Sequence, residues 1–322
     1  MAIKTNYTFR SADGSSTIHA VRWLPEGAAA DGSGAKVRAV LQITHGMVEY
    51  IERYEPFAEY LTTQGFAVFG HDHIGHGESV KSPEELGIMR AADPSDIMVE
   101  DMFANFQIIK EQYPDLPYFI LGHSMGSYML RKYLSVKAED LDGVNGAIIM
   151  GTGTEPNATI KAGLAMAKTL ARIKGRDYRS PLMAKMAFGK PYQKYDMTGA
   201  DPSNSWLTKD EAIVKKYYSD PKCTYTFSLN GYVGLISSTK YDNDPKNIAK
   251  IPKDLPILFI SGDQDPVGNF GAGVKAAYDK FVAAGIKDVT LRLVEGDRHE
   301  VLNELDKEQV FEGLKDWMEG KM

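Results

Sequence analysis

The sequence predicts an α/β fold in which helices cover both faces of a mostly parallel sheet and a helical segment interrupts the sheet. Short β-rich runs alternate with longer helical patterns from residue 39 to 150. The alternation stops over residues 154–245 and returns from residue 256. Such alternation is typical of a parallel sheet with helices on both faces. We therefore expect residues 1–153 and 246–322 to form the two parts of one core, with residues 154–245 inserted as a helical cap.

The elements before the insertion follow from periodicity and turn residues. Residues 7–10 and 17–23 flank Asp13-Gly14 and predict a hairpin. The helical period of residues 50–64 ends at Gly65. Further strands are predicted at residues 39–44, 67–69, 118–121 and 147–150, and further helices at residues 94–112 and 126–136.

The insertion and the second core part differ in pattern. Residues 154–245 hold helical segments and loops rich in Met, Tyr, Lys and Gly, without a clear strand. After them, residues 256–261 and 289–294 predict strands, and residues 273–284 and 304–318 predict helices.

Composition restricts the class of protein. The 322 residues carry a net charge of −6, with 43% hydrophobic and 25% charged residues, which is ordinary for a soluble globular chain. Nothing suggests a basic surface for nucleic acid. The N-terminal residues lack the apolar core of a signal peptide, and no run reaches the length of a membrane span. With Cys223 as its single cysteine, which we interpret as a packing residue, the chain is expected to be cytoplasmic.

The strongest motif is Gly122-His123-Ser124-Met125-Gly126. It follows a predicted strand and precedes a predicted helix, which is the setting of a nucleophilic serine held in a tight turn. Glycines two positions either side leave room for the neighbouring strand and helix. The N–H of Met125 would lie at a helix N-terminus, where it can stabilise negative charge. The motif therefore predicts Ser124 as a nucleophile.

An activated serine needs a histidine base and a carboxylate that orients it. In hydrolases with this serine turn, the acid and then the histidine follow the serine along the chain. Of seven histidines only His299 lies after Ser124, so it is the predicted base. The acid should follow the strand at residues 256–261, where Asp263 and Asp265 compete.

The loop after the strand at residues 67–69 carries His71, His73 and His76. Three histidines within six residues invite a metal interpretation. However, Gly75 stands before the third histidine, where metallo-hydrolases of this pattern carry an aspartate, and no histidine cluster follows downstream. We therefore expect no metal site at these histidines.

Three motifs together resemble the monoglyceride lipase and lysophospholipase family of α/β-hydrolases, whose members are often described as serine aminopeptidase-like. They are Asp72-x-x-Gly75-His76-Gly77-x-Ser79, His45-Gly46 and the Ser124 pentapeptide. The resemblance covers nearly the whole chain, including residues 206–208 and 220–231 of the insertion. It implies an eight-stranded core, a helical cap between the sixth and seventh strands, and hydrolysis of carboxylic esters without a metal or organic cofactor.

The same resemblance assigns the remaining catalytic groups. The superfamily pattern Gly-x-x-Asp-x-x-Val favours Asp265 as the acid, although the second spacer here is one residue shorter, which leaves Asp263 as the alternative. The step His45-Gly46 at a strand end implies that the N–H of Met47 is the second oxyanion donor.

The leading functional hypothesis is an esterase that acts on monoacylglycerol-like, lysophospholipid-like or other short-to-medium acyl esters, with transient lipid contact possible. Met183, Met186 and Phe188 are candidate residues of an acyl-binding roof, or else the core of the cap itself. A second hypothesis is an aminopeptidase of the same fold, with Glu49 or acidic residues of the cap as a subsite for the substrate amine. A third is a non-catalytic protein that only binds a ligand.

Overall fold

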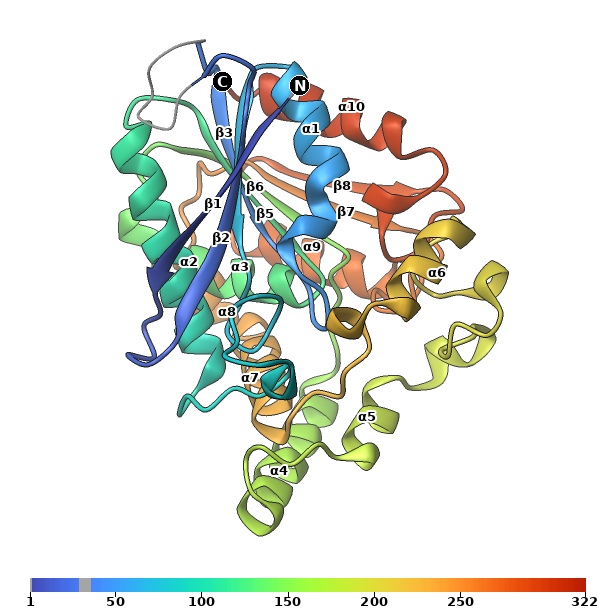
Figure 1. The fold of residues 1–322 in the computed structure, drawn as a ribbon. Coiled ribbons are helices and arrows are strands. Elements are labelled where there is room, and N and C mark those ends of the chain that lie inside the picture. Colours follow the sequence, from blue (N-terminus) through green and yellow to red (C-terminus); the bar gives the residue numbers. More distant parts are fainter. Residues whose placement is uncertain (1, 29–35) are drawn as a thin grey trace.

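The computed structural model describes residues 2–28 and 36–322, and these residues contain one eight-stranded sheet (Figure 1). Its spatial order is β1-β2-β4-β3-β5-β6-β7-β8. β2 is antiparallel to β1 and to β4, and the other neighbouring pairs are parallel, so the expected mostly parallel sheet is confirmed. The strands are Ile3–Arg10 (β1), Thr17–Leu24 (β2), Ala39–Thr44 (β3), Phe66–His71 (β4), Tyr118–His123 (β5), Val144–Met150 (β6), Ile257–Gly262 (β7) and Val289–Val294 (β8).

Helices cover both faces of this sheet. Successive side chains of β5 point to opposite faces, so Tyr118 and Ile120 lie in one core and Phe119 and Leu121 in the other. The helices α2, α3 and α9 pack on the first face, and α1 and α10 pack on the second (Figure 1). Their bounds are Glu55–Thr63 (α1), Pro94–Gln112 (α2), Met125–Val136 (α3), Ala272–Ala283 (α9) and Lys307–Glu319 (α10).

The segment between β6 and β7 is helical, as the fold prediction requires. It contains Asn157–Lys174 (α4), Pro181–Ala187 (α5), Glu211–Ser219 (α6), Leu229–Asp242 (α7) and Pro245–Ile248 (α8). Helix α7 packs against α2, α3 and α4, which joins the insertion to the core. In Figure 1, α4 and α5 project at one end of the molecule, away from the sheet. The division at residues 154 and 245 stays a prediction.

Two helices begin more than one residue away from the predicted position, each for a local reason. The helix predicted at residues 50–64 begins as a 3₁₀ turn, Ile51–Tyr54, and becomes α-helical at Glu55, where Pro56 suits the first turn. The last helix begins at Lys307, because the backbone of Glu304 is extended and its carboxylate accepts hydrogen bonds from two loop N–H groups. No helix within residues 2–28 and 36–322 is long and apolar enough to span a membrane.

Candidate active site

Ser124 lies in the turn between β5 and α3, with φ 53° and ψ −120°. A Cβ atom on Gly126 would lie 2.2 Å from the carbonyl oxygen of Thr44, and one on Gly122 would lie 2.4 Å from that of Gly126. Real Cβ atoms do not approach backbone this closely, so neither glycine accommodates a side chain. The strand, the helix and the two glycines together determine the position of Ser124.

Asp265 and His299 are in direct contact. The Nδ1 atom of His299 lies 3.0 Å from Oδ2 of Asp265, and both side chains are buried. The Asp265 carboxylate also accepts hydrogen bonds from the Ser261 hydroxyl at 3.0 Å and from the Val267 N–H at 2.8 Å. These two donors fix the carboxylate, and the carboxylate in turn orients the imidazole.

Asp263 occupies a different part of the same turn. Its Oδ1 accepts hydrogen bonds from the N–H of Gly296 at 2.9 Å and from the side-chain amide of Gln264 at 3.1 Å. It therefore connects two loops, while Asp265 is the aspartate that reaches His299.

The loop after β3 approaches the serine. A Cβ atom on Gly46 would lie 2.9 Å from Cβ of Ser124, so only glycine allows this approach. Within the described parts of the chain, the N–H groups of Met47 and Met125 donate to no protein acceptor. Unpaired donors of this kind are what the predicted oxyanion hole requires, and that assignment stays a prediction.

A family model described as serine aminopeptidase, S33, matches residues 35–306. The chain belongs to this family of α/β-hydrolases. The resemblance found in the sequence motifs is thus confirmed.

Three similar proteins illustrate the relationship. Mouse (Mus musculus) monoglyceride lipase is 26% identical over 290 residues, which cover 87% of this chain and 82% of the mouse protein. A monoacylglycerol lipase of Mycolicibacterium smegmatis is 26% identical over 329 residues, or 98% of this chain and 97% of the relative. A thermostable carboxyl esterase from Bacillus coagulans is 29% identical, with a TM-score of 0.87 over 100% of this chain and 99% of that chain.

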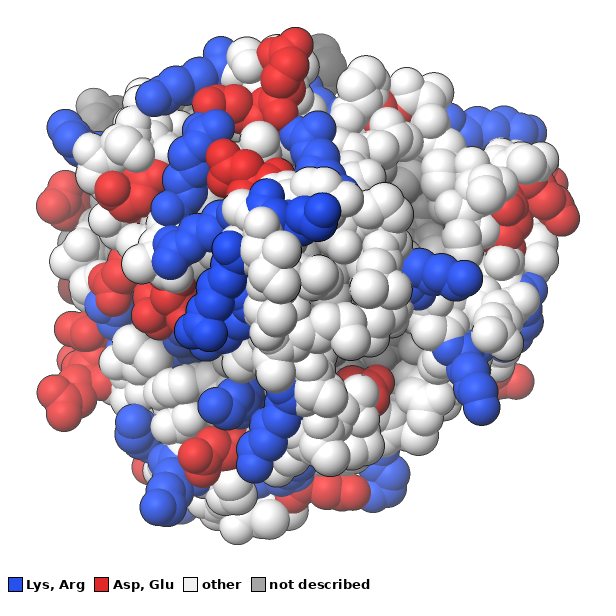
Figure 2. Space-filling view, turned by 90° about the horizontal axis from the view of Figure 1, so that it is seen from below, with Lys and Arg blue, Asp and Glu red and all other residues white. Residues whose placement is uncertain are grey.

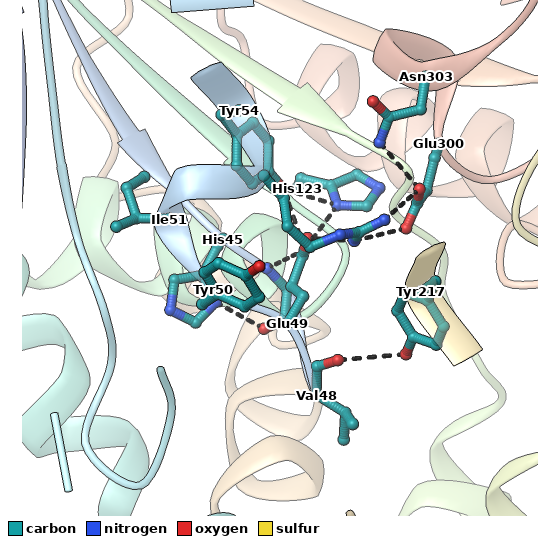
Figure 3. Close-up of polar contacts among 12 residues, drawn as sticks. His45, Val48, Glu49, Tyr50, Ile51, Tyr54, His123, Tyr217, Glu300 and Asn303 are labelled. Carbon is teal, nitrogen blue, oxygen red and sulfur yellow. Dashed lines mark hydrogen bonds and ion pairs between the residues drawn. The ribbon is translucent and has the colours of Figure 1, made fainter. Parts of the chain in front are cut away.

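Glu49 of this S33-family hydrolase is buried, and Figure 3 shows the polar groups around it. Its carboxylate accepts hydrogen bonds from the N–H of Gly46 at 2.5 Å, from Arg53 at 2.8 Å and from the Tyr54 hydroxyl at 3.0 Å. It also lies 3.1 Å from Nδ1 of His123. Four groups of the protein thus already occupy this carboxylate, which the aminopeptidase hypothesis offers as a subsite for a substrate amine.

Both ring nitrogens of His123 face acceptors. Nδ1 faces the Glu49 carboxylate, and Nε2 lies 3.2 Å from the backbone carbonyl oxygen of His299. Burial lowers the pKa of His123, but the hydrogen bond and the negative charge of Glu49 outweigh burial and raise it. A ring protonated on both nitrogens satisfies both acceptors. His123 thereby connects the turn that carries Ser124 to the Gly46 loop and to the loop that carries His299.

A second ion pair extends this group of charges. Arg53 donates to both carboxylate oxygens of Glu300, at 2.8 and 2.7 Å (Figure 3). Glu300 follows His299 directly in the chain, so Arg53 also anchors the loop that carries His299. Arg53 and His123 thus face the two buried carboxylates of Glu49 and Glu300. This cluster was not predicted from the sequence, although the i, i+4 spacing of Glu49 and Arg53 is a known signal for an ion pair.

We expect Glu49→Gln to lower kcat roughly 10- to 100-fold with little change in KM, because small displacements of catalytic groups reduce rates by such factors. The substitution keeps the size of the side chain but removes the charge that holds His123 and the Gly46 loop. Steady-state hydrolysis of a short p-nitrophenyl ester measures the effect. Glu52→Gln is the control, since Glu52 is partly exposed and pairs with Lys4. An unchanged kcat in Glu49→Gln would contradict this role.

The His123–Glu49 contact also predicts a pH dependence of stability. A raised histidine pKa stabilises the fold fully below the unfolded value of about 6.5, and this contribution is lost as pH rises through the folded pKa. The pKa of Glu49 is lowered because His123 and Arg53 outweigh burial, so its contribution is lost only in strong acid. Urea unfolding should therefore show the largest difference between wild type and Glu49→Gln at about pH 4.5–6.5, and a smaller one in alkali. A difference that grows with alkaline pH would contradict the protonated His123.

His71 at the end of β4, and His73 and His76 in the loop that follows, form a buried cluster with His45. The N–H of His73 donates to Nε2 of His45 at 2.9 Å, and the His45 ring contacts those of His73 and His76. Burial is the main reason that the pKa values of His71 and His76 are lowered to about 3. In the described residues, no three His, Cys, Asp or Glu side chains are grouped in a way that could hold a metal ion.

The candidate roof residues lie in different environments. Met183 is buried, whereas Met186 is 46% exposed. Phe188 contacts Trp206, with ring centroids 5.9 Å apart, and Trp206 stacks on the His299 ring at 5.0 Å. Of the three, Phe188 is connected to His299 through one aromatic ring.

The single thiol, Cys223, is buried. Burial raises its pKa to about 12, so the thiol is protonated at neutral pH. A protonated buried thiol is a poor nucleophile, which agrees with its interpretation as a packing residue.

Proposed function

We propose that this carboxylic ester hydrolase uses Ser124, His299 and Asp265 as a catalytic triad. The hydrogen bond between His299 and the buried Asp265 is the observation on which this proposal mainly depends. It places a carboxylate on Nδ1 and leaves Nε2 as the basic nitrogen. The glycine-framed turn of Ser124 supplies the nucleophile.

The reaction follows from these groups. Ser124 Oγ attacks the ester carbonyl while Nε2 of His299 accepts its proton, and Asp265 stabilises the resulting imidazolium. The N–H groups of Met47 and Met125 hold the oxyanion. His299 then protonates the leaving alcohol, and a water molecule, activated by the same histidine, releases the carboxylic acid from Ser124.

We further propose that the substrates are monoacylglycerol-like, lysophospholipid-like or other short-to-medium acyl esters. The similarity to monoglyceride lipases and to a carboxyl esterase supports this class. The aminopeptidase alternative gains no support from Glu49, whose oxygens are engaged by the protein itself. Turnover of p-nitrophenyl esters of graded length, compared with aminoacyl-naphthylamides, tests the choice. Faster cleavage of the amides would overturn the ester proposal.

Phe188→Ala should change the acyl-length preference without abolishing turnover of short esters. Each buried CH₂ is worth about 0.8 kcal/mol, or roughly fourfold in kcat/KM, so a closed pocket gives a rising series that breaks where the pocket ends. Removing Phe188 should move that break to longer chains. Met186→Ala is the matched control, because Met186 is largely exposed and should have a smaller effect. An unchanged profile with a lower Tm would assign Phe188 to the core of the cap.

A further inference from the structure

One segment of the insertion lies against the loop that carries His299. The N–H of His299 donates to the backbone carbonyl oxygen of Trp206 at 3.4 Å, and the N–H of Glu300 donates to that of Leu207 at 2.8 Å. Trp206 and Leu207 lie between α5 and α6, far from His299 in the chain. The backbone of the insertion is thus bonded directly to the backbone of the proposed base.

Two side chains hold this contact in place. The guanidinium of Arg298 donates to three backbone carbonyl oxygens of the segment at 3.2, 2.5 and 3.3 Å, those of Ser203, Ser205 and Thr208. Lys209 pairs with the buried carboxylate of Asp297 at 2.8 Å. Asp297 and Arg298 directly precede His299, so these bonds fix the segment relative to the imidazole.

The indole of Trp206 stacks on the imidazole of His299. The ring centroids are 5.0 Å apart, and the ring planes are inclined by 27°. The ring of His123 also lies near His299, but it is tilted by 41°, and both its nitrogens face acceptors of their own. The face of an indole carries negative π-electron density and attracts a cation. Trp206 therefore presents an attractive face to a positively charged His299.

Further aromatic rings surround this indole. Its centroid lies 5.4 Å from that of Tyr192 and 5.9 Å from that of Phe188. Figure 2 views the molecule from the end at which α4 and α5 project, and shows Lys and Arg side chains beside a wide uncharged area. A contact between a cation and an aromatic face is strongest where apolar groups keep water away, as these rings do beside His299.

We propose that Trp206 is a positioning residue of the reaction, which fixes the plane of the His299 ring and stabilises the imidazolium through its π face. The inference rests on the proposed triad, in which His299 is neutral before the attack and positively charged once it has accepted the proton of Ser124. The attraction to the indole is stronger in the charged state than in the neutral one. It therefore lowers the barrier of the reaction instead of binding the substrate more tightly.

Trp206→Leu tests this role on p-nitrophenyl acetate, whose short acyl chain makes the assay independent of acyl-length preference. We expect kcat to fall roughly 5- to 30-fold while KM stays within a few-fold, and Trp206→Phe to recover part of the loss because it keeps an aromatic face. Trp317→Leu is the matched control and should keep the kcat of wild type, since Trp317 is also partly buried but contacts Phe119 instead. A wild-type kcat with a lower Tm in Trp206→Leu would overturn the proposal, because Trp206 would then only pack.

A fluorinated tryptophan tests the charge without a change of shape. Biosynthetic incorporation replaces all three tryptophans of the chain. Fluorine withdraws electron density from the ring face, so kcat should fall. The same incorporation into Trp206→Phe changes only Trp23 and Trp317, and it should leave the kcat of that variant unaltered. Equal rates of the fluorinated and the ordinary wild type would overturn the stabilisation of the imidazolium.

His299→Ala separates this inference from the proposed function. We expect an inactive His299→Ala beside a slowed Trp206→Leu. An inactive His299→Ala beside a fully active Trp206→Leu would overturn the inference and leave the triad in place. An active His299→Ala would overturn the triad itself, and the role of Trp206 with it.

Discussion

Ser124→Ala should lose covalent labelling by a fluorophosphonate probe and lose ester turnover by roughly 10³-fold or more. The probe reacts with an activated serine, and alanine has no oxygen to form the acyl-enzyme. The members of a triad act as a unit, so the remaining groups recover little of the rate. Labelling followed by mass spectrometry of the intact protein, together with initial rates on a short p-nitrophenyl ester, measures both effects.

A neighbouring serine provides the control. Ser127 lies in the first turn of helix α3, and its hydroxyl donates to the carbonyl oxygen of Ser124 at 2.6 Å. It is therefore close to Ser124 without occupying the bend between β5 and α3. Ser127→Ala should still be labelled and should retain most of its activity. If Ser124→Ala is labelled as well as wild type, another residue is the nucleophile and the triad proposal fails.

Asp265→Asn should lower kcat by roughly 10³- to 10⁴-fold, the range known for the equivalent change in serine proteases. The reason lies in the donors around the carboxylate. Oδ1 accepts from the Val267 N–H, so an asparagine oxygen stays there and its NH₂ group faces Nδ1 of His299. Nδ1 must then accept, which places the ring proton on Nε2. A protonated Nε2 cannot take the proton of Ser124.

Asp263→Asn is the matched comparison, since the same substitution is made two residues away. Its Oδ1 can still accept the Gly296 N–H, so we expect kcat within a few-fold of wild type and a stability change of about 1 kcal/mol or less. Rates and urea midpoints of both variants are measured side by side. If Asp263→Asn is the inactive variant, the acid must be reassigned to Asp263.

Periodicity and turn chemistry were sufficient to predict the fold. The strands at residues 39–44 and 289–294 were predicted with the same bounds as β3 and β8, because apolar runs flanked by turn residues leave little freedom. Chain order singled out His299. The choice between Asp263 and Asp265 depended on a resemblance, because both lie in one polar turn and only side-chain direction distinguishes them.

The cluster around Glu49 shows why other features were missed. Its members come from residues 49–54, 123 and 300, and no local pattern connects segments so far apart in the chain. Glu49 follows the strand that leads to the active site, so it was expected to face the substrate. Its side chain instead turns under the Gly46 loop. The candidate cap residues were equally hard to place, because periodicity does not tell which helix face meets the core.

The backbone of Ser124 has an evolutionary consequence. Holding a residue with a side chain at this positive φ destabilises the fold by about 1–3 kcal/mol, and a glycine at the same position would remove most of this strain. Replacing Ser124 by glycine would therefore raise the thermal stability of the chain, and under the proposed triad it is selection for catalysis that keeps the serine in place. In a descendant that had given up catalysis, position 124 would be among the first to drift to glycine, while the flanking Gly122 and Gly126 would remain.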